Sequence, residues 1–177
     1  IKGCFACLQG ANLVAAYLEK DNAILMMFYL MSYWGVFISF LGNIFAIKAS
    51  TNKKDFQVPA VICNEMGMAC NMVIVPVFWG ALFAYFMKDI NFNNLRDVLD
   101  FIHMTVTHSS PLIISIVNLV LTKDMVYVPS DWKLAFLLGC SYILVNYFGT
   151  MTNDKPMYPG KYFDWSNFAD AFGMYFL

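Results

Sequence analysis

Residues 24–47 read ILMMFYLMSYWGVFISFLGNIFAI, and this run decides the fold because it contains no charged residue. A helix needs about 20 apolar residues to cross the hydrocarbon core of a bilayer, which is about 30 Å thick. Four more apolar stretches follow or precede it, with short polar connections between them: 1–18, 58–87, 98–122 and 132–152. We therefore predict an all-α integral membrane helical bundle of five to six transmembrane helices, forming a single domain over 1–177.

The last residues, 167–177 (NFADAFGMYFL), are too few to cross a bilayer, and we interpret them as the start of a sixth span. We expect the long stretch 58–87 to be tilted and bent near Pro76. Lysine and arginine are divided almost evenly between the two sides, so the orientation is left open. The organelle is open as well, since an endomembrane and the mitochondrial inner membrane both fit.

The composition supports this prediction and excludes some function classes. Hydrophobic residues make up 60% and charged residues 13%, against about 45–50% and about 25% in soluble domains. The net charge is −1 and Arg96 is the one arginine, so few side chains can grip phosphates in two places, and nucleic acid is not an expected partner. Membrane lipids are expected partners, and other membrane subunits are a further possibility.

The cysteines do not indicate a metal site. All five fall within apolar stretches, and although Cys4 and Cys7 form a CxxC, no second pair or nearby histidine completes a zinc-binding set. We interpret them as small buried side chains and expect neither a metal nor another cofactor.

Polar side chains inside the spans are the candidates for function, because they are costly to keep away from water. Ser32 and His108 lie roughly 12 and 15 Å below the same membrane surface, at about 1.5 Å of helix rise per residue. A serine becomes a nucleophile when a neighbouring base takes its proton, so this pair is a candidate for catalysis. The same pair is also an ordinary hydrogen bond between two helices.

A second polar group is expected in the opposite half of the bilayer. Asn43, Glu65 and Asn118 each lie within about 10 Å of the other surface by helix rise. We interpret this cluster first as structural, with the carboxyl protonated and donating to an asparagine, and second as a proton or ligand site.

Three further residues are secondary candidates: His103, Asn71 and Thr107. His103 is turned by about 140° from His108 around the helix, which disfavours a metal site made by the two histidines. Asn71 and Thr107, or Tyr33, would have to supply the missing oxyanion donor, because amides inside a helix are already bonded.

The order of these signals resembles the rolling-stone-like and androgen-induced-protein families of eukaryotic membrane proteins, usually pictured as six-helix bundles. The resemblance covers roughly 24–170 and rests on four places. FYLMSYWG (28–35) is similar to an aromatic stretch in which the family has threonine two residues before tryptophan. VIVPVFW (73–79) matches an apolar run ending in an aromatic-tryptophan pair. The other two are His108 followed by Pro111 and Asn118, and an exit loop with MYP (157–159) and DWS (164–166).

The resemblance implies an intramembrane hydrolase that cleaves fatty-acid esters, with Ser32 and His108 in the positions of the family's threonine and histidine. Two departures matter: serine replaces threonine, which keeps a hydroxyl nucleophile, and Asn118 stands where the family has an acidic residue. Rolling-stone-like members are associated with membrane fusion and cell contact.

Two other function classes remain as alternatives. A non-catalytic accessory subunit of a larger membrane complex, such as an organellar respiratory assembly, would fit the 18% aromatic content and the exposed segment 153–166. A transporter or channel would need a continuous line of polar groups, whereas the predicted groups form two clusters separated by Trp34, Phe37 and Phe40.

Overall fold

The structure is a computed structural model, which describes residues 2–19, 29–51, 54–121 and 129–153 together with five positions of the C-terminal segment: Tyr158, Asp164, Trp165, Asn167 and Ala171. The long helices are α1 (Lys2–Glu19), α3 (Met31–Ser50), α4 (Gln57–Val77), α6 (Leu95–Leu121) and α7 (Trp132–Asn153). The short elements are η1 (Lys54–Phe56), the π-helical turn η2 (Phe78–Leu82), α5 (Phe83–Phe86), η3 (Met87–Asp89) and η4 (Pro129–Asp131). The all-α prediction is confirmed for these residues.

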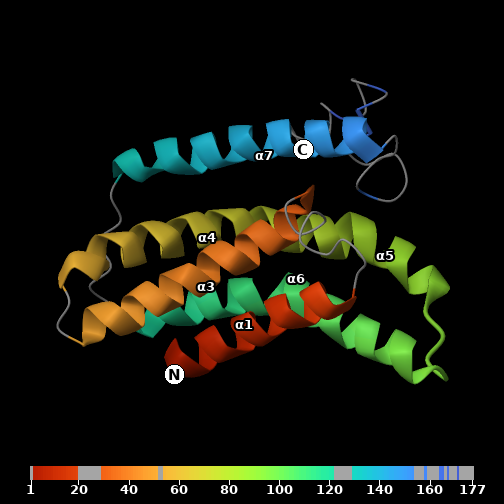
Figure 1. Ribbon diagram of the computed structural model, residues 1–177, viewed down its shortest axis with the longest axis horizontal. Helices are drawn as coiled ribbons and strands as arrows, with labels where there is room; N and C mark the ends of the chain where they lie inside the picture. Colours follow the sequence, from red (N-terminus) through yellow and green to blue (C-terminus); the bar gives the residue numbers. More distant parts are fainter. Residues whose placement is uncertain are drawn as a thin grey trace.

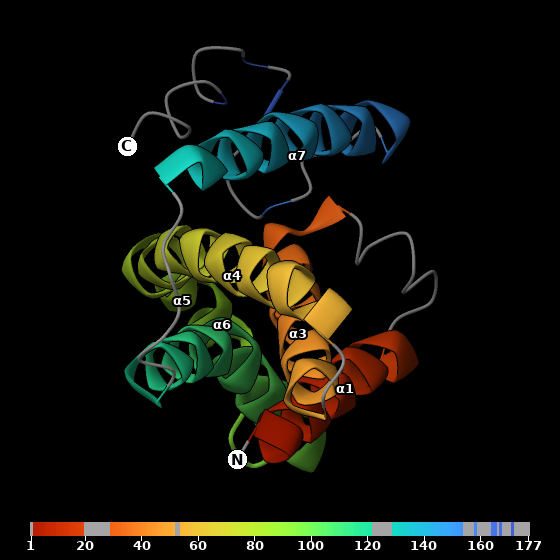
Figure 2. The same ribbon diagram turned by 90° about the vertical axis from the view of Figure 1, so that its left-hand side faces the viewer.

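The long helices lie side by side with their axes roughly along one direction (Figure 1). α7 covers one side of the molecule, α1 and α6 the other, and α3 and α4 lie between them (Figure 2). α3 and α6 run in the same direction, while α1, α4 and α7 run in the opposite one (Figure 1). Each long helix therefore begins at the end of the bundle where the long helix before it finishes (Figure 1).

Three helical stretches of the described residues are long and apolar enough to cross a membrane: Met31–Ser50, Gln57–Phe86 and Trp132–Thr152. This shows a membrane protein, but not the five to six spans that the sequence predicts. α1 and α6 are long enough, but their apolar character is diluted by polar and charged side chains. α1 carries Gln9 and Asn12 inside the bundle, and α6 begins with charged residues and continues with histidines and hydroxyls.

The predicted span 24–47 is not one continuous helix. Leu30 has an extended backbone, with φ −101° and ψ 121°, so α3 begins at Met31 and runs on to Ser50. Residues 24–28 lie outside the described part of the chain, as does nearly all of 167–177. The break puts Ser32 in the first turn of α3 instead of several turns inside a helix.

α3 and α4 form the closest pair because small residues face each other. A Cβ atom added at Gly67 would lie 2.6 Å from Ser39 Oγ and 3.3 Å from Ser39 Cα, and one at Gly35 would lie 2.5 Å from Asn71 Oδ1. Gly35, Ser39 and Gly42 all lie buried along α3. Such small-residue seams let the backbones of membrane helices approach closely.

The interior of the bundle is polar and its exterior is apolar. Among the described residues eleven polar side chains are buried, slightly more than the ten apolar ones, while large apolar side chains such as Val58, Phe136 and Leu137 are more than 60% exposed. A protein in water arranges these classes the other way round. In a bilayer the arrangement is favourable, because lipid covers the apolar outside and buried polar groups bond each other.

Candidate functional site

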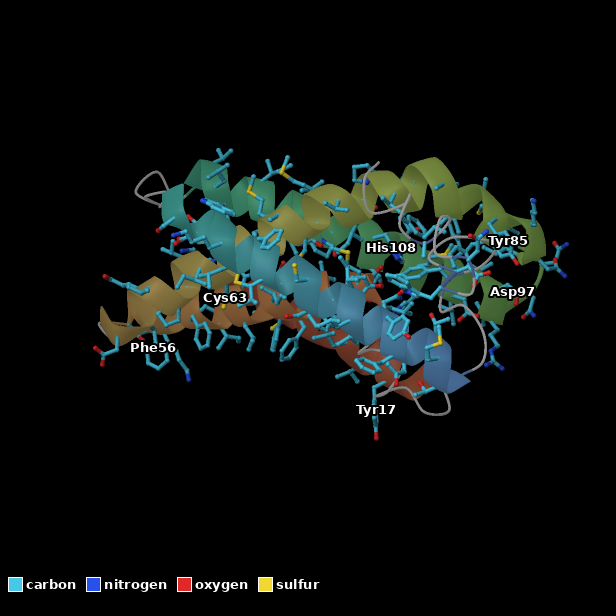
Figure 3. All side chains as sticks on the ribbon, turned by 90° about the horizontal axis from the view of Figure 1, so that it is seen from above. Tyr17, Phe56, Cys63, Tyr85, Asp97 and His108 are labelled. Atoms are coloured by element: carbon cyan, nitrogen blue, oxygen red, sulfur yellow. The ribbon has the colours of Figure 1, made fainter. Side chains whose placement is uncertain are left out.

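The structure brings Ser32 and His108 together. The Ser32 hydroxyl, in the first turn of α3, lies 2.8 Å from Nε2 of His108 on α6. Seen from the α7 side, His108 lies between the two ends of the bundle, with Phe56 near one end and Asp97 near the other (Figure 3). The expected proximity of the two side chains is therefore observed.

The hydrogen-bond partners of His108 determine which of its two ring nitrogens accepts a hydrogen bond. Nδ1 lies 2.7 Å from the backbone carbonyl oxygen of Met104, one turn earlier in α6. A carbonyl oxygen only accepts, so Nδ1 carries the proton, and in a neutral imidazole Nε2 is then the acceptor. The Ser32 hydroxyl therefore donates to Nε2, which is the direction that general-base activation requires.

A π-helical turn places Phe78 flat against the histidine ring. Pro76 lacks an N–H and crowds the carbonyl one turn before it, and the α-helical pattern of α4 gives way to the wider turn η2 (Phe78–Leu82) two residues later. The ring of Phe78 then stacks on that of His108, with 3.7 Å between centroids and 10° between planes. The irregular turn thus lies two residues beyond Pro76, near the position where the sequence predicts a bend, but the stacking is not readable from the sequence.

A second hydrogen-bond network holds the start of α3; we call Tyr142, Asn146, Tyr158 and Trp165 the Tyr142 network. The Tyr158 hydroxyl accepts from the Met31 amide at 3.0 Å and lies 2.7 Å from the Tyr142 hydroxyl. Tyr142 donates to the Tyr29 carbonyl at 3.2 Å. Because the one hydroxyl hydrogen of Tyr142 goes to the Tyr29 carbonyl, Tyr158 is the donor in the bond between the two hydroxyls. Burial raises the pKa of the Tyr158 hydroxyl, which favours its protonated form.

The same network extends to the tryptophan of the exit loop. Asn146, fully buried on α7, donates to the Tyr142 oxygen at 3.3 Å and accepts from Trp165 Nε1 at 2.8 Å. The segment that follows α7 is thereby joined to both α7 and α3. The sequence marks Tyr158 and Trp165 as an exit-loop motif, but it does not show that they contact the start of α3.

Two members of the second predicted cluster, Asn43 and Asn118, are hydrogen-bonded to each other, and Gln9 of α1 joins them. Asn118 donates to Asn43 Oδ1 at 3.0 Å, and Asn43 donates to Gln9 Oε1 at 3.0 Å and to the carbonyl of Ser39 at 3.1 Å. Gln9, Asn43 and Asn118, the amide network, thus link α1, α3 and α6. Glu65 is half-buried on α4. The bond expected between its carboxyl and an asparagine of this cluster stays a prediction.

The secondary candidates are engaged elsewhere. Asn71 donates to Ser39 Oγ at 3.1 Å, between the two clusters. Thr107 contacts Asn12 Oδ1 at 3.0 Å and the backbone carbonyl of His103 at 2.8 Å. Neither bond leads to Ser32, so neither side chain is a good oxyanion donor for an attack by that hydroxyl. Ser39 therefore places a polar atom in the stretch of α3 that the sequence predicts to separate the clusters, and Asn71 of α4 places another beside it.

Among the described residues no three histidine, cysteine, aspartate or glutamate side chains converge as metal ligands. The five cysteines are unpaired, and Cys4 and Cys7 are exposed instead of buried as predicted. Cys4 and Cys7 lie on α1, outside the polar interior that holds Ser32 and His108.

The fold and the site define a class: an all-helical membrane protein with a part-buried serine-histidine pair in a polar interior. Comparison of the chain with protein families, with curated proteins and with solved structures finds no match.

Proposed function

We propose that this protein is an intramembrane lipid hydrolase of the type found in the androgen-induced-protein family, cleaving fatty-acid esters with Ser32 as nucleophile and His108 as base. The observation that carries the proposal is the 2.8 Å contact between Ser32 Oγ and His108 Nε2, combined with the Met104 carbonyl that fixes the ring tautomer. The carbonyl takes the orienting place that a carboxylate has in a serine-histidine-aspartate triad.

The steps of the reaction follow from these contacts. His108 Nε2 takes the Ser32 proton while Oγ attacks the acyl carbon, and the imidazolium then gives that proton to the departing alcohol oxygen. The acyl group is left on Ser32. A water molecule, deprotonated by the same nitrogen, attacks the acyl-serine, and proton return to Ser32 Oγ releases the fatty acid.

The start of α3 supplies a donor for the developing oxyanion. The first amides of a helix have no carbonyl partner inside the helix. Tyr158 takes the Met31 amide, and the Tyr33 amide bonds the Leu30 carbonyl at 3.1 Å. The amide of Ser32 lies between these two, and we assign it to the oxyanion, because the helix dipole favours negative charge there.

Labelling with a fluorophosphonate probe tests the proposal. We expect the purified protein to react, and Ser32→Ala and His108→Ala to abolish labelling, since each removes a member of the pair. Ser39→Ala, a buried serine of the same helix, and His103→Ala, the other histidine of α6, are the matched controls and should label normally. A wild-type protein that stays unlabelled while folded contradicts the proposal.

The arrangement also supports a fourth crossing helix, α6, beside the three that are apolar enough to span. α3 and α6 run in the same direction and meet at two levels: Ser32 bonds His108, and Asn43 bonds Asn118. These contacts are eleven residues apart on α3 and ten on α6, a rise of about 15 Å. α6 therefore follows α3 through about half of the bilayer thickness. We propose that α6 crosses the membrane beside α3.

The accessory-subunit alternative is favoured by one feature of α7. Its buried residues all belong to the second half, from Tyr142 onward, while Trp132, Phe136 and Leu137 in the first half are at least 60% exposed. Partner helices in a larger assembly would cover this half, as would lipid. A protein that stays unlabelled and migrates only within a larger complex would favour that function.

A further inference from the structure

The contacts of the Tyr142 network surround Ser32 on both sides along the chain. Before Ser32, the Tyr29 carbonyl accepts from Tyr142 and the Met31 amide donates to Tyr158. After it, Trp34 packs edge-on against the Tyr142 ring, with centroids 5.7 Å apart. The backbone that carries Ser32 is therefore fixed from α7 and the C-terminal segment, while its hydroxyl is held from α6.

This support replaces the capping that α3 lacks. The residue before the helix is Leu30, whose side chain makes no capping hydrogen bond. Helices without a cap fray in their first turn, which is where Ser32 lies. The Tyr158 hydroxyl bonds the first amide of α3 in place of a cap, and it comes from a segment more than a hundred residues further along the chain.

The close approach of Tyr29 requires a glycine on α7. A Cβ atom added at Gly149 would lie 2.5 Å from the Tyr29 ring. Gly149 and the fully buried Asn146 lie on the same half of α7 as Tyr142, the half that packs on the bundle. α7 therefore contacts the start of α3 through residues close to Ser32 in the sequence, namely Tyr29 and Trp34.

We propose that Tyr142 and Tyr158 are positioning residues for Ser32, holding the first turn of α3 so that the hydroxyl stays aligned with His108 and the Ser32 amide stays aimed at the oxyanion. The inference depends on the proposed hydrolase function. Neither tyrosine contacts the reacting atoms. Their role is to limit the movement of the backbone that carries the Ser32 hydroxyl and amide. A small displacement of a nucleophile lowers the reaction rate strongly.

The test separates chemistry from binding. Tyr158→Phe and Tyr142→Phe remove one hydroxyl each and keep the rings. We expect the limiting rate of fluorophosphonate labelling to fall about 10- to 100-fold, with little change in the probe concentration that gives half of that rate. Tyr17→Phe, at a tyrosine 53% exposed on α1, is the control and should react at the wild-type rate.

A double variant carrying both phenylalanines should lose about as much as either single one, because the two hydroxyls act in one chain of hydrogen bonds. Trp165→Phe, which removes the donor to Asn146, should give a smaller loss in the same direction and serves where a tyrosine variant does not fold. Limiting rates equal to that of Tyr17→Phe in folded variants would overturn the inference while leaving the hydrolase function intact.

Hydrogen exchange covers the case in which the wild-type protein is not labelled and the hydrolase function fails. Amides of residues 31–34 should then exchange faster in Tyr158→Phe than in the wild-type protein, since the first turn of α3 loses its anchor. Unchanged exchange in that turn would overturn the positioning role itself.

Discussion

At the scale of single residues, the sequence indicates which polar groups meet but not what holds them. Ser32 and His108 are predictable as neighbours because their distances from the ends of two parallel spans are nearly equal, and the break at Leu30 does not change that level. The break itself is hidden in a uniformly apolar run. Phe78 and Tyr142 escape prediction because an aromatic residue in an apolar stretch looks the same whether it packs against lipid or a histidine.

The partners of Asn43 illustrate the limit of depth alone. Depth predicts its contact with Asn118, whereas its bond to Gln9 of α1 is not predicted. Depth gives the position along a helix, and the direction around the helix decides the partner. Gln9 was the available partner on a span that the sequence marks as only weakly apolar.

Asn43 should be the most sensitive of the buried amides. Asn43→Ala removes three hydrogen bonds, to Gln9, Asn118 and the Ser39 carbonyl. At about 0.6 kcal/mol per bond in membrane proteins, the loss is about 2 kcal/mol, which lowers the thermal unfolding midpoint in detergent by about 5 °C. Asn64→Ala, whose amide bonds only its own helix at Ala60, is the control and should change the midpoint much less. Equal shifts would mean that the amide network does not stabilise the bundle.

At the scale of the elements, the α3–α4 seam should tolerate no added volume. Gly67→Ala places a methyl group 3.3 Å from Ser39 Cα and 2.6 Å from its hydroxyl, so the helices must separate or the serine must move. We expect a loss of about 1–3 kcal/mol, typical of overpacking. Gly139→Ala on α7, with nothing within 4 Å of the new carbon, should not destabilise. Thermal unfolding of the two variants in the same detergent measures the difference, and equal midpoints would contradict the close seam.

The elements also show why the number of spans is hard to read from hydropathy. α6 has Asp97 in its first turn and hydroxyls and histidines further on, so it is not among the apolar stretches that can cross by composition. Polar side chains of α6 make its bonds to the neighbouring helices: Thr107 bonds α1, and His108 and Asn118 bond α3. A helix that supplies the polar interior of a bundle is less apolar for that reason, although its outer face is rich in isoleucine and leucine: Leu99, Ile102, Ile113, Ile116 and Leu119.

At the scale of the whole molecule, the parallel course of α3 and α6 links the candidate site to the topology. α3 begins at the end of the bundle where α7 finishes (Figure 1). Ser32 lies in the first turn of α3 and bonds His108, and the Asn43–Asn118 bond lies about three turns further along both helices, toward the other end. Tyr142 and Tyr158 also contact α3 at its beginning, next to Ser32. If α6 lay flat on one surface instead, it could not meet α3 at both levels.

Cysteine accessibility tests this topology. In a variant without the five native cysteines, single changes Thr51→Cys, Asn93→Cys and Ser130→Cys introduce exposed thiols after α3, before α6 and before α7. An impermeant maleimide is added outside sealed vesicles. We expect Thr51→Cys and Ser130→Cys to give the same result, both labelled or both protected. Asn93→Cys should give the opposite result, because α6 carries the chain across. If Asn93→Cys and Ser130→Cys react from the same side, α6 does not cross. The contact between Ser32 and His108 would then have to form at a surface, where water reaches the pair and a hydrolase confined to lipid substrates would no longer be favoured.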